Sequence, residues 1–365
     1  PRWSLALFAA LGAVARAGPV VGATVGGSDG AVFTLTNNIA GNEVVVFDRF
    51  ADGSLGAQRS YSTRGTGTGG GLGNQGALAL SDSGRWLLAV NPGSNSVSVF
   101  LTVGNFLYRT DTEASGGNTP VSVTIEDDVV YVLNAGSDNI QGFRLGIYGK
   151  LTPIAGSQRA LSGTGTAAAQ VEFNRDGDLL AVTEKATNRV LTFTVDGDGR
   201  LSQATIQASP SPTPFGFAFG RRDQLLVSEA VGGAAGASTL SSYRLNGDAS
   251  VDVVSAAVPS GQSAACWVVI TREGRYAFVS NTASGNLSTY RIGGDGAATL
   301  ASAVAADTGA GSGPTDMALD RNSRFLYVLN NTTIGAFRVG PGGALTRIED
   351  QAFSGPAFAT GMVAR

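Results

Sequence analysis

The sequence predicts an all-β protein, a seven-bladed β-propeller of four-stranded antiparallel blades. An apolar run that ends in a polar side chain recurs about seven times along the 365 residues, at intervals of roughly 43–54 residues. Glycine is abundant, with 52 residues, and only 15% of the residues are charged. Such a composition suits many short strands joined by tight turns. The recurring runs are residues 32–37, 86–91, 129–134, 179–184, 225–229, 276–281 and 325–330.

The last repeat indicates how one blade is built. Residues 315–319 form a short strand A, and the apolar run 325–329 forms strand B after a polar turn. Strand C follows at 333–337, a glycine turn at 340–343, and a weaker outer strand D at 344–353. Strand B is apolar on both faces, as expected for a strand buried between neighbouring sheets.

The two ends of the repeat array predict how the ring closes. The first strand B has no strand A before it, and residues 356–363 have no strand B after them. The simplest arrangement places this last segment as strand A of the first blade. Such a closure leaves no free sheet edge.

The N-terminal segment predicts secretion. Arg2 precedes a short apolar run over residues 5–14, and Ala15-Arg-Ala17 fits a small-x-small cleavage site. The apolar run is too short to span a bilayer. We therefore expect a signal peptide over residues 1–17, a propeller over residues 18–365, an extracellular location and no membrane association.

The net charge limits the classes of binding partner, and the cysteine and sequon positions predict local properties. The net charge of −3 gives no basic footprint for nucleic acid, so we expect a monomer that binds a small molecule. The only cysteine, Cys266, lies in an apolar run and is expected to be a buried hydrophobic residue. Glycosylation sequons begin at Asn286, Asn330 and Asn331, although Asn330 follows a buried strand too closely to accept a glycan.

The chain contains no histidine. This excludes a Ser-His-Asp triad and a His-ligated metal centre, and a general base would have to be a carboxylate whose pKa is raised by burial. The glycine-rich residues 64–74 lack the Gly-Lys-Ser/Thr ending of a phosphate-binding loop. We interpret them as a surface loop.

The ends of the B strands give the first set of candidate site residues. They lie on the face with the longer, irregular loops, where function is expected on a rigid scaffold. Five of these strands end in asparagine, and two neighbouring ones end in Glu184 and Glu229. The asparagines are expected mainly to bond turn backbone, whereas the two carboxylates add charge that the scaffold does not need. Glu184 and Glu229 are therefore the candidate catalytic residues.

The starts of the A strands give the second set, because they should line the mouth of the central channel on the same face. Together with the B-strand residue Asn91, they are the candidate substrate-binding residues. Acidic residues of both sets could instead hold Ca²⁺, although no spacing motif supports a metal or another cofactor. The A-strand set is Gln75, Gln170, Phe215, Trp267, Asp316 and Phe358.

The blade pattern, clearest in residues 274–290, resembles the seven-bladed propeller lactonase family, which includes 6-phosphogluconolactonases and 3-carboxymuconate lactonising enzymes. Cys266-Trp-Val-Val269 followed by Thr271-Arg-Glu-Gly-Arg275 is also similar to that family. The resemblance implies a lactonase-like propeller over the whole mature chain. Glu184 is the best match to the family's Asn-Glu at the end of a B strand, with Thr183 in the asparagine's place. The family's histidine has no counterpart.

Two functional hypotheses follow. In the first, the protein hydrolyses or isomerises a lactone or related small carboxylate; Glu184 or Glu229 activates water while Gln75 and Asn91 orient the carbonyl group. In the second, it is a secreted binding or surface protein that keeps the scaffold without catalysis. The paired glutamates favour the first hypothesis, and the missing histidine favours the second.

Overall fold

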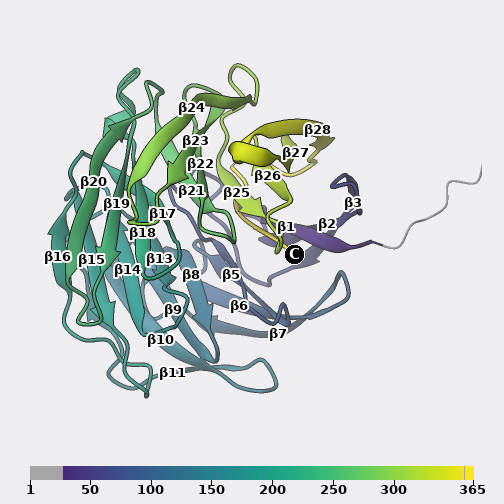
Figure 1. The fold of residues 1–365 in the computed structure, drawn as a ribbon. Helices are drawn as coiled ribbons and strands as arrows, with labels where there is room; N and C mark the ends of the chain where they lie inside the picture. Colours follow the sequence, from purple (N-terminus) through teal and green to yellow (C-terminus); the bar gives the residue numbers. More distant parts are fainter. Residues whose placement is uncertain (1–27, 357) are drawn as a thin grey trace, which may run out of the picture.

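The predicted propeller is confirmed. The computed structural model describes residues 28–356 and 358–365, and the predicted signal peptide lies outside the described residues. Seven antiparallel sheets follow one another around a central axis, and the chain returns to its starting point at the end (Figure 1). Each sheet has four strands in the order A, B, C and D from the axis outwards, and an additional short strand joins the third sheet.

The first four blades, each in the order A to D, have the following strands. Blade 1 contains β29 (Thr360–Ala364), β1 (Gly30–Leu35), β2 (Glu43–Arg49) and β3 (Leu55–Ser62). Blade 2 contains β4 (Leu78–Leu80), β5 (Trp86–Asn91), β6 (Ser96–Val103) and β7 (Phe106–Ala114). Blade 3 contains β8 (Pro120–Glu126), β9 (Val129–Asn134), β10 (Asn139–Leu145) and β11 (Leu151–Pro153), with β12 (Arg159–Ala160) also paired to β10. Blade 4 contains β13 (Ala168–Phe173), β14 (Leu179–Glu184), β15 (Arg189–Thr194) and β16 (Thr205–Ala208).

The remaining three blades complete the ring. Blade 5 contains β17 (Pro214–Phe219), β18 (Gln224–Glu229), β19 (Thr239–Leu245) and β20 (Val251–Pro259). Blade 6 contains β21 (Ala265–Ile270), β22 (Tyr276–Asn281), β23 (Asn286–Ile292) and β24 (Ala298–Asp307). Blade 7 contains β25 (Asp316–Leu319), β26 (Phe325–Leu329), β27 (Thr333–Val339) and β28 (Leu345–Ala352). Two short 3₁₀ turns, η1 (Val231–Gly233) and η2 (Pro341–Gly343), lie in loops.

The core lies between the sheets, where the B strands are buried on both faces. Every residue of β14, β18 and β26 is buried, whereas β20 and β24 are mostly exposed or half-buried. Aromatic residues near the ends of the C strands fill these inter-sheet layers, as shown by the full burial of Phe100, Phe193 and Tyr243. Apolar packing between like sheets therefore fixes the geometry on which any site depends.

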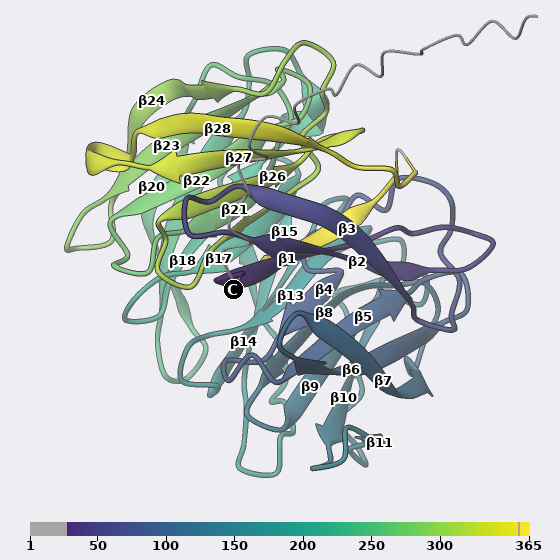
Figure 2. The same ribbon diagram turned by 90° about the vertical axis from the view of Figure 1, so that its right-hand side faces the viewer.

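The closure prediction is also confirmed. β29 pairs antiparallel with β1, and the register aligns Phe33 with Val363 and Thr34 with Met362. Figure 2 shows this last strand lying beside β1. The strand begins at Thr360 and not at residue 356, because a turn with a bond from the Ala359 amide to the Pro356 carbonyl precedes it.

The ring has two faces. The D–A and B–C connections lie on one face, which we call the B–C face. The A–B and C–D turns lie on the other, which we call the A–B face. The A–B turns are tight, and Gly84, Gly177 and Gly274 close three of them with positive φ.

Candidate functional site

Glu184 is fully buried at the end of β14, and its hydrogen-bond donors come from the loop after blade 3 and from the B–C turn of blade 4. Its Oε1 accepts a bond from the Ser162 amide at 2.9 Å, and its Oε2 accepts from the hydroxyls of Ser162 and, at 2.5 Å, Thr187. The carboxylate thus pins the loop after blade 3 to the B–C turn of blade 4. It does not line a cavity.

Glu229 has the same type of environment at the end of β18. It is fully buried and accepts bonds from the hydroxyls of Ser209 at 3.2 Å, Thr239 at 2.5 Å and Ser241. Burial raises its pKa to about 7, against the opposing effect of the hydroxyl donors. Like Glu184, it lines neither of the cavities described below.

Asn91 shows the amide version of this arrangement. Its side-chain nitrogen donates to the hydroxyls of Ser96 at 3.3 Å and Ser98 at 2.9 Å, and its oxygen accepts from Asn42 at 3.1 Å. The asparagine and the two glutamates therefore have the same structural role: at the end of strand B, each forms hydrogen bonds with nearby polar side chains. The structure does not bring Glu184 and Glu229 together in an open pocket.

Gln75 and Gln170 form the inner end of the central channel. The Gln75 side chain reaches across the axis and pairs with both backbone groups of Val268, at 3.1 Å to the amide and 2.8 Å to the carbonyl. Gln170 pairs with both backbone groups of Phe217 at 2.7 and 2.9 Å. Each bonded residue follows an irregularity in strand A, so the glutamines satisfy backbone groups that the sheet leaves free.

Aromatic side chains cover the B–C end of the axis. The rings of Phe215 and Trp267 lie 5.2 Å apart, and Lys185 Nζ lies 4.8 Å from the Phe215 ring centre and donates to the Gly73 carbonyl. Burial lowers the pKa of Lys185 to about 8. Phe215 and Trp267 are buried, whereas Phe358 is half-exposed. The predicted mouth is therefore packed with side chains.

The main cavity opens at the opposite face from the one expected. It has a volume of about 1010 Å³ and follows the A strands from Gln75, Gln170 and Asp316 to the exposed A–B turns. Three of the predicted binding residues therefore line a cavity, but they form its inner end and not its mouth. The expectation of a mouth on the B–C face is corrected, because the glutamine pairs and the aromatic cover occupy that end.

Three carboxyl groups in this central cavity have raised pKa values. Burial, followed by the nearby Asp82, Asp127 and Asp176, raises the pKa of Glu126 to about 7. Burial raises the pKa of Glu172 to about 8, although a 2.7 Å bond from the Gln170 amide opposes the shift.

Asp316 is the third. Burial raises its pKa well above the usual value, although its Oδ1 accepts the Met317 amide at 2.8 Å. Its Oδ2 has no hydrogen-bond partner among the described residues. A buried oxygen of this kind can accept or donate a bond to a bound molecule.

The contact between neighbouring A strands shows how deep Glu126 and Glu172 lie in the cavity. Thr124 Oγ1 accepts the Phe173 amide at 3.3 Å, so these residues lie at one level of neighbouring A strands. Glu126 lies two residues further towards the turns, and Glu172 one residue further inwards. They are therefore separated by about 10 Å along the strands.

Arginines from blades 6 and 7 line the opposite side of the mouth. Arg272 and Arg321 both contribute to the cavity lining. Strand A of blade 1 is the C-terminal strand β29, so no A–B turn connects it to β1. Arg321 of blade 7 spans this gap and donates to the Asp82 carbonyl of blade 2 at 3.3 Å. Sequence reasoning identified Asp316 but missed the cavity's other charged residues. Aligning the A–B turns would have found four of them, because one turn position holds Asp82, Arg175, Arg272 and Arg321.

Other predicted features are placed as follows. Cys266 is buried as predicted, and burial raises its pKa to about 11. The Asn286 side chain is buried and bonded to Gln262 and Asn281, so this sequon is not accessible to a glycan. Within residues 28–356 and 358–365, no group of three His, Cys, Asp or Glu side chains is placed to hold a metal ion. In the same residues, no helix has the length and apolar character needed to cross a membrane.

The comparisons with known proteins agree with this fold. Residues 28–164 match the sequence profile of the lactonase seven-bladed β-propeller family, which confirms the resemblance inferred from the blade pattern. No curated protein sequence matches the chain.

Solved structures are similar over almost the whole chain. A Bacteroides uniformis protein, provisionally described as a 6-phosphogluconolactonase, has a TM-score of 0.73 and 16% identity, covering 91% of this chain and 99% of that one. The periplasmic gluconolactonase of Pseudomonas aeruginosa has a TM-score of 0.70 and 15% identity, covering 92% and 98%. At this identity the likeness establishes the fold alone.

Proposed function

We propose that this protein is a lactone hydrolase whose substrate enters the central cavity from the A–B face. The observation that carries the proposal is Glu126, a half-buried carboxyl group at the mouth whose pKa is raised to about 7. A general base is most effective when its pKa lies near the working pH. The cavity volume of about 1010 Å³ is sufficient for a small lactone.

The chemistry requires one proton acceptor and a place for negative charge. A water molecule attacks the ring carbonyl carbon while the Glu126 carboxylate takes a proton from that water. The ring C–O bond then breaks, the released oxygen takes the proton from the protonated Glu126, and the hydroxy acid leaves with Glu126 returned to its carboxylate form. Arg272 and Arg321, on the other side of the mouth, stabilise the charge that develops on the carbonyl oxygen.

The deeper carboxyl groups have a binding role in this proposal. Burial raises the pKa of Glu172 to about 8, so this group is largely protonated at neutral pH, and burial also raises the pKa of Asp316. Protonated carboxyls donate as well as accept hydrogen bonds. They would bind hydroxyl or carbonyl groups of the substrate, against the inner end formed by Gln75 and Gln170.

The test is a hydrolysis assay on a panel of small lactones, corrected for spontaneous ring opening, with the pH profile of kcat/KM for the wild type and Glu126→Gln. We expect the wild-type rate to rise with a midpoint near pH 7, since only the carboxylate accepts a proton. Glu126→Gln should lose about 10²- to 10⁴-fold. Glu113→Gln, on the outer strand β7 and away from the cavity, should keep the wild-type profile.

A specific observation favours a second candidate, a binding protein without catalysis. Glu184 and Glu229 are fully occupied by hydroxyl donors, and the chain has no histidine. In that case the wild type would hydrolyse no lactone of the panel. Secretion after removal of residues 1–17, a monomeric state and a small-molecule ligand belong to both proposals.

A further inference from the structure

A second, smaller cavity lies on the A–B face beside the mouth of the central cavity. Its volume is about 420 Å³, and it is lined by Arg221, Arg272, Glu273, Asn322 and Arg324. These residues come from the A–B turns of blades 5, 6 and 7. We call this cavity the arginine pocket.

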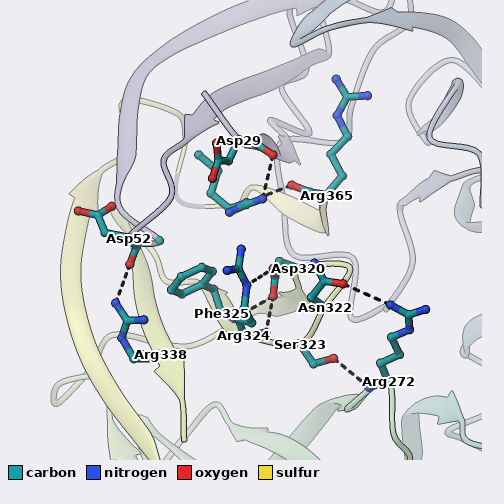
Figure 3. Close-up of polar contacts among 12 residues, drawn as sticks. Asp29, Asp52, Arg272, Asp320, Asn322, Ser323, Arg324, Phe325, Arg338 and Arg365 are labelled. Atoms are coloured by element: carbon teal, nitrogen blue, oxygen red, sulfur yellow. Dashed lines mark hydrogen bonds and ion pairs between the residues drawn. The ribbon is translucent and has the colours of Figure 1, made fainter. Parts of the chain in front are cut away.

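The arginines are positioned by contacts between the blades. The stem of Arg221 rests on the turn of blade 6, where a Cβ added at Gly274 would lie 3.0 Å from Arg221 Cγ. The backbone amide of Arg272 donates to Ser323 Oγ at 2.9 Å, and its side chain donates to Asn322 Oδ1 at 3.2 Å. Figure 3 shows these two contacts between blades 6 and 7.

Arg324 is held differently. Its guanidinium lies 5.3 Å from the ring centre of the buried Phe325, and Figure 3 shows it beside Asp320. The Asp320 side chain is only 1% exposed and caps the turn by accepting the Arg324 and Phe325 amides at 2.6 and 2.8 Å. Its closest approach to the Arg324 side chain is 3.9 Å at Nε.

The pocket has an excess of positive charge and of free donors. Three guanidinium groups face one acidic lining residue, Glu273. The Arg221 side chain and the two terminal nitrogens of Arg324 make no hydrogen bond with any described residue. Since a guanidinium group presents its N–H donors in a fork that matches oxyanions, the pocket offers several such edges in one concavity.

We propose that the arginine pocket binds an oxyanion group, the carboxylate, sulfate or phosphate of a ligand. Guanidinium pairs with oxyanions form short, charge-assisted and often bidentate hydrogen bonds. Contacts with the neighbouring blade position Arg221 and Arg272, and contacts within blade 7 position Arg324, so less side-chain order has to be gained on binding. The inference does not depend on lactone hydrolysis.

The experiment is calorimetric titration of the full chain with inorganic sulfate and, separately, inorganic phosphate, at constant ionic strength set with sodium chloride. We expect saturable binding of one ion per chain. Arg221→Gln and Arg324→Gln should each weaken it by about tenfold, the range for a charge-assisted bond. These two arginines line only the arginine pocket, so lactone turnover is not involved.

Arg291→Gln is the matched control, because Arg291 is an exposed arginine on β23 outside both cavities. It should bind the ion as the wild type does. Melting curves of all variants check that the exposed substitutions leave the fold intact. The proposal is overturned by the absence of saturable binding, by unchanged binding in Arg221→Gln and Arg324→Gln, or by an equal loss in Arg291→Gln.

Discussion

Two regions of the A–B face have the same type of backbone but carry side chains of opposite charge; we call blades 3 and 4 the acidic side and blades 5 and 6 the basic side. On blades 3 and 4, Glu126 rests on the turn glycine of the next blade, where a Cβ at Gly177 would lie 2.7 Å from Glu126 Cγ. On blades 5 and 6, Arg221 rests on Gly274 in the same way, at 3.0 Å. The backbone of the two turns is alike, with φ of 72° at Gly177 and 69° at Gly274. The crossing residues differ, since Glu126 is the last residue of β8 whereas Arg221 lies within the A–B turn of blade 5.

The chemical outcome differs accordingly. On the acidic side, Asp82 and Asp176 add to burial and raise the pKa of Glu126. On the basic side, guanidinium groups remain charged at any working pH. The acidic side can therefore exchange protons near neutral pH, whereas the basic side provides fixed positive charge. The ring fixes where a side chain is placed, and individual turn residues decide its chemistry.

The largest expected effect tests the ring on which both sides depend. Deleting residues 356–365 removes β29, which pairs with β1 and buries Met362. It also removes the Arg365 carbonyl to which Arg49 Nε donates at 3.1 Å. We expect a loss on the order of 5 kcal/mol or more, enough to unfold a typical domain. Thermal melting followed by circular dichroism measures it, and an unchanged midpoint would contradict the closure account.

The fold could be predicted because its signals are repeated along the chain. The B strand at residues 325–329 was predicted with the bounds that the structure gives. Seven such runs set the blade count. The missing strand A of blade 1 then required the C-terminal segment to fill that position.

The site was less predictable because a repeat position does not reveal where a side chain's hydrogen bonds go. Glu184 and Glu229 were chosen for replacing asparagine, yet Ser162, Thr239 and other hydroxyl donors occupy their oxygens. Gln75 is expected at the channel mouth but lies at the inner end of the cavity, because its bond across the axis to Val268 depends on an irregular strand in a distant blade. Such long-range pairing has no local sequence signal.

A smaller effect distinguishes the acidic side by its response to pH. The pKa of Glu172 is about 8 in the folded chain against the ordinary glutamate value of 4.5, so the folded state binds more protons between these values. Stability should therefore fall as pH rises from about 4.5 to 8. Glu172→Gln removes this loss and should be more stable than the wild type at pH 9, by up to a few kcal/mol, with little difference at pH 4.

Denaturant midpoints at pH 4, 7 and 9 measure this effect. Arg221→Gln on the basic side is the matched control, and its stability should follow pH as the wild type's does, because the substitution leaves Glu172 in place. If Glu172→Gln tracks the wild type at every pH, Glu172 is not the buried titrating group that the acidic side requires.

Substitutions of the two turn glycines should have the smallest effects on stability, and they best distinguish the acidic side from the basic side. Gly177→Ala and Gly274→Ala should each cost about 1 kcal/mol of stability, because both positions have positive φ. Their functional effects should differ, since the added Cβ displaces Glu126 in one case and Arg221 in the other. We expect Gly177→Ala to shift the pH midpoint of lactone hydrolysis and leave sulfate binding unchanged. Gly274→Ala should weaken sulfate binding a few-fold and leave the pH midpoint unchanged. If both variants altered both properties equally, the two sides would be one coupled site and not two independent ones.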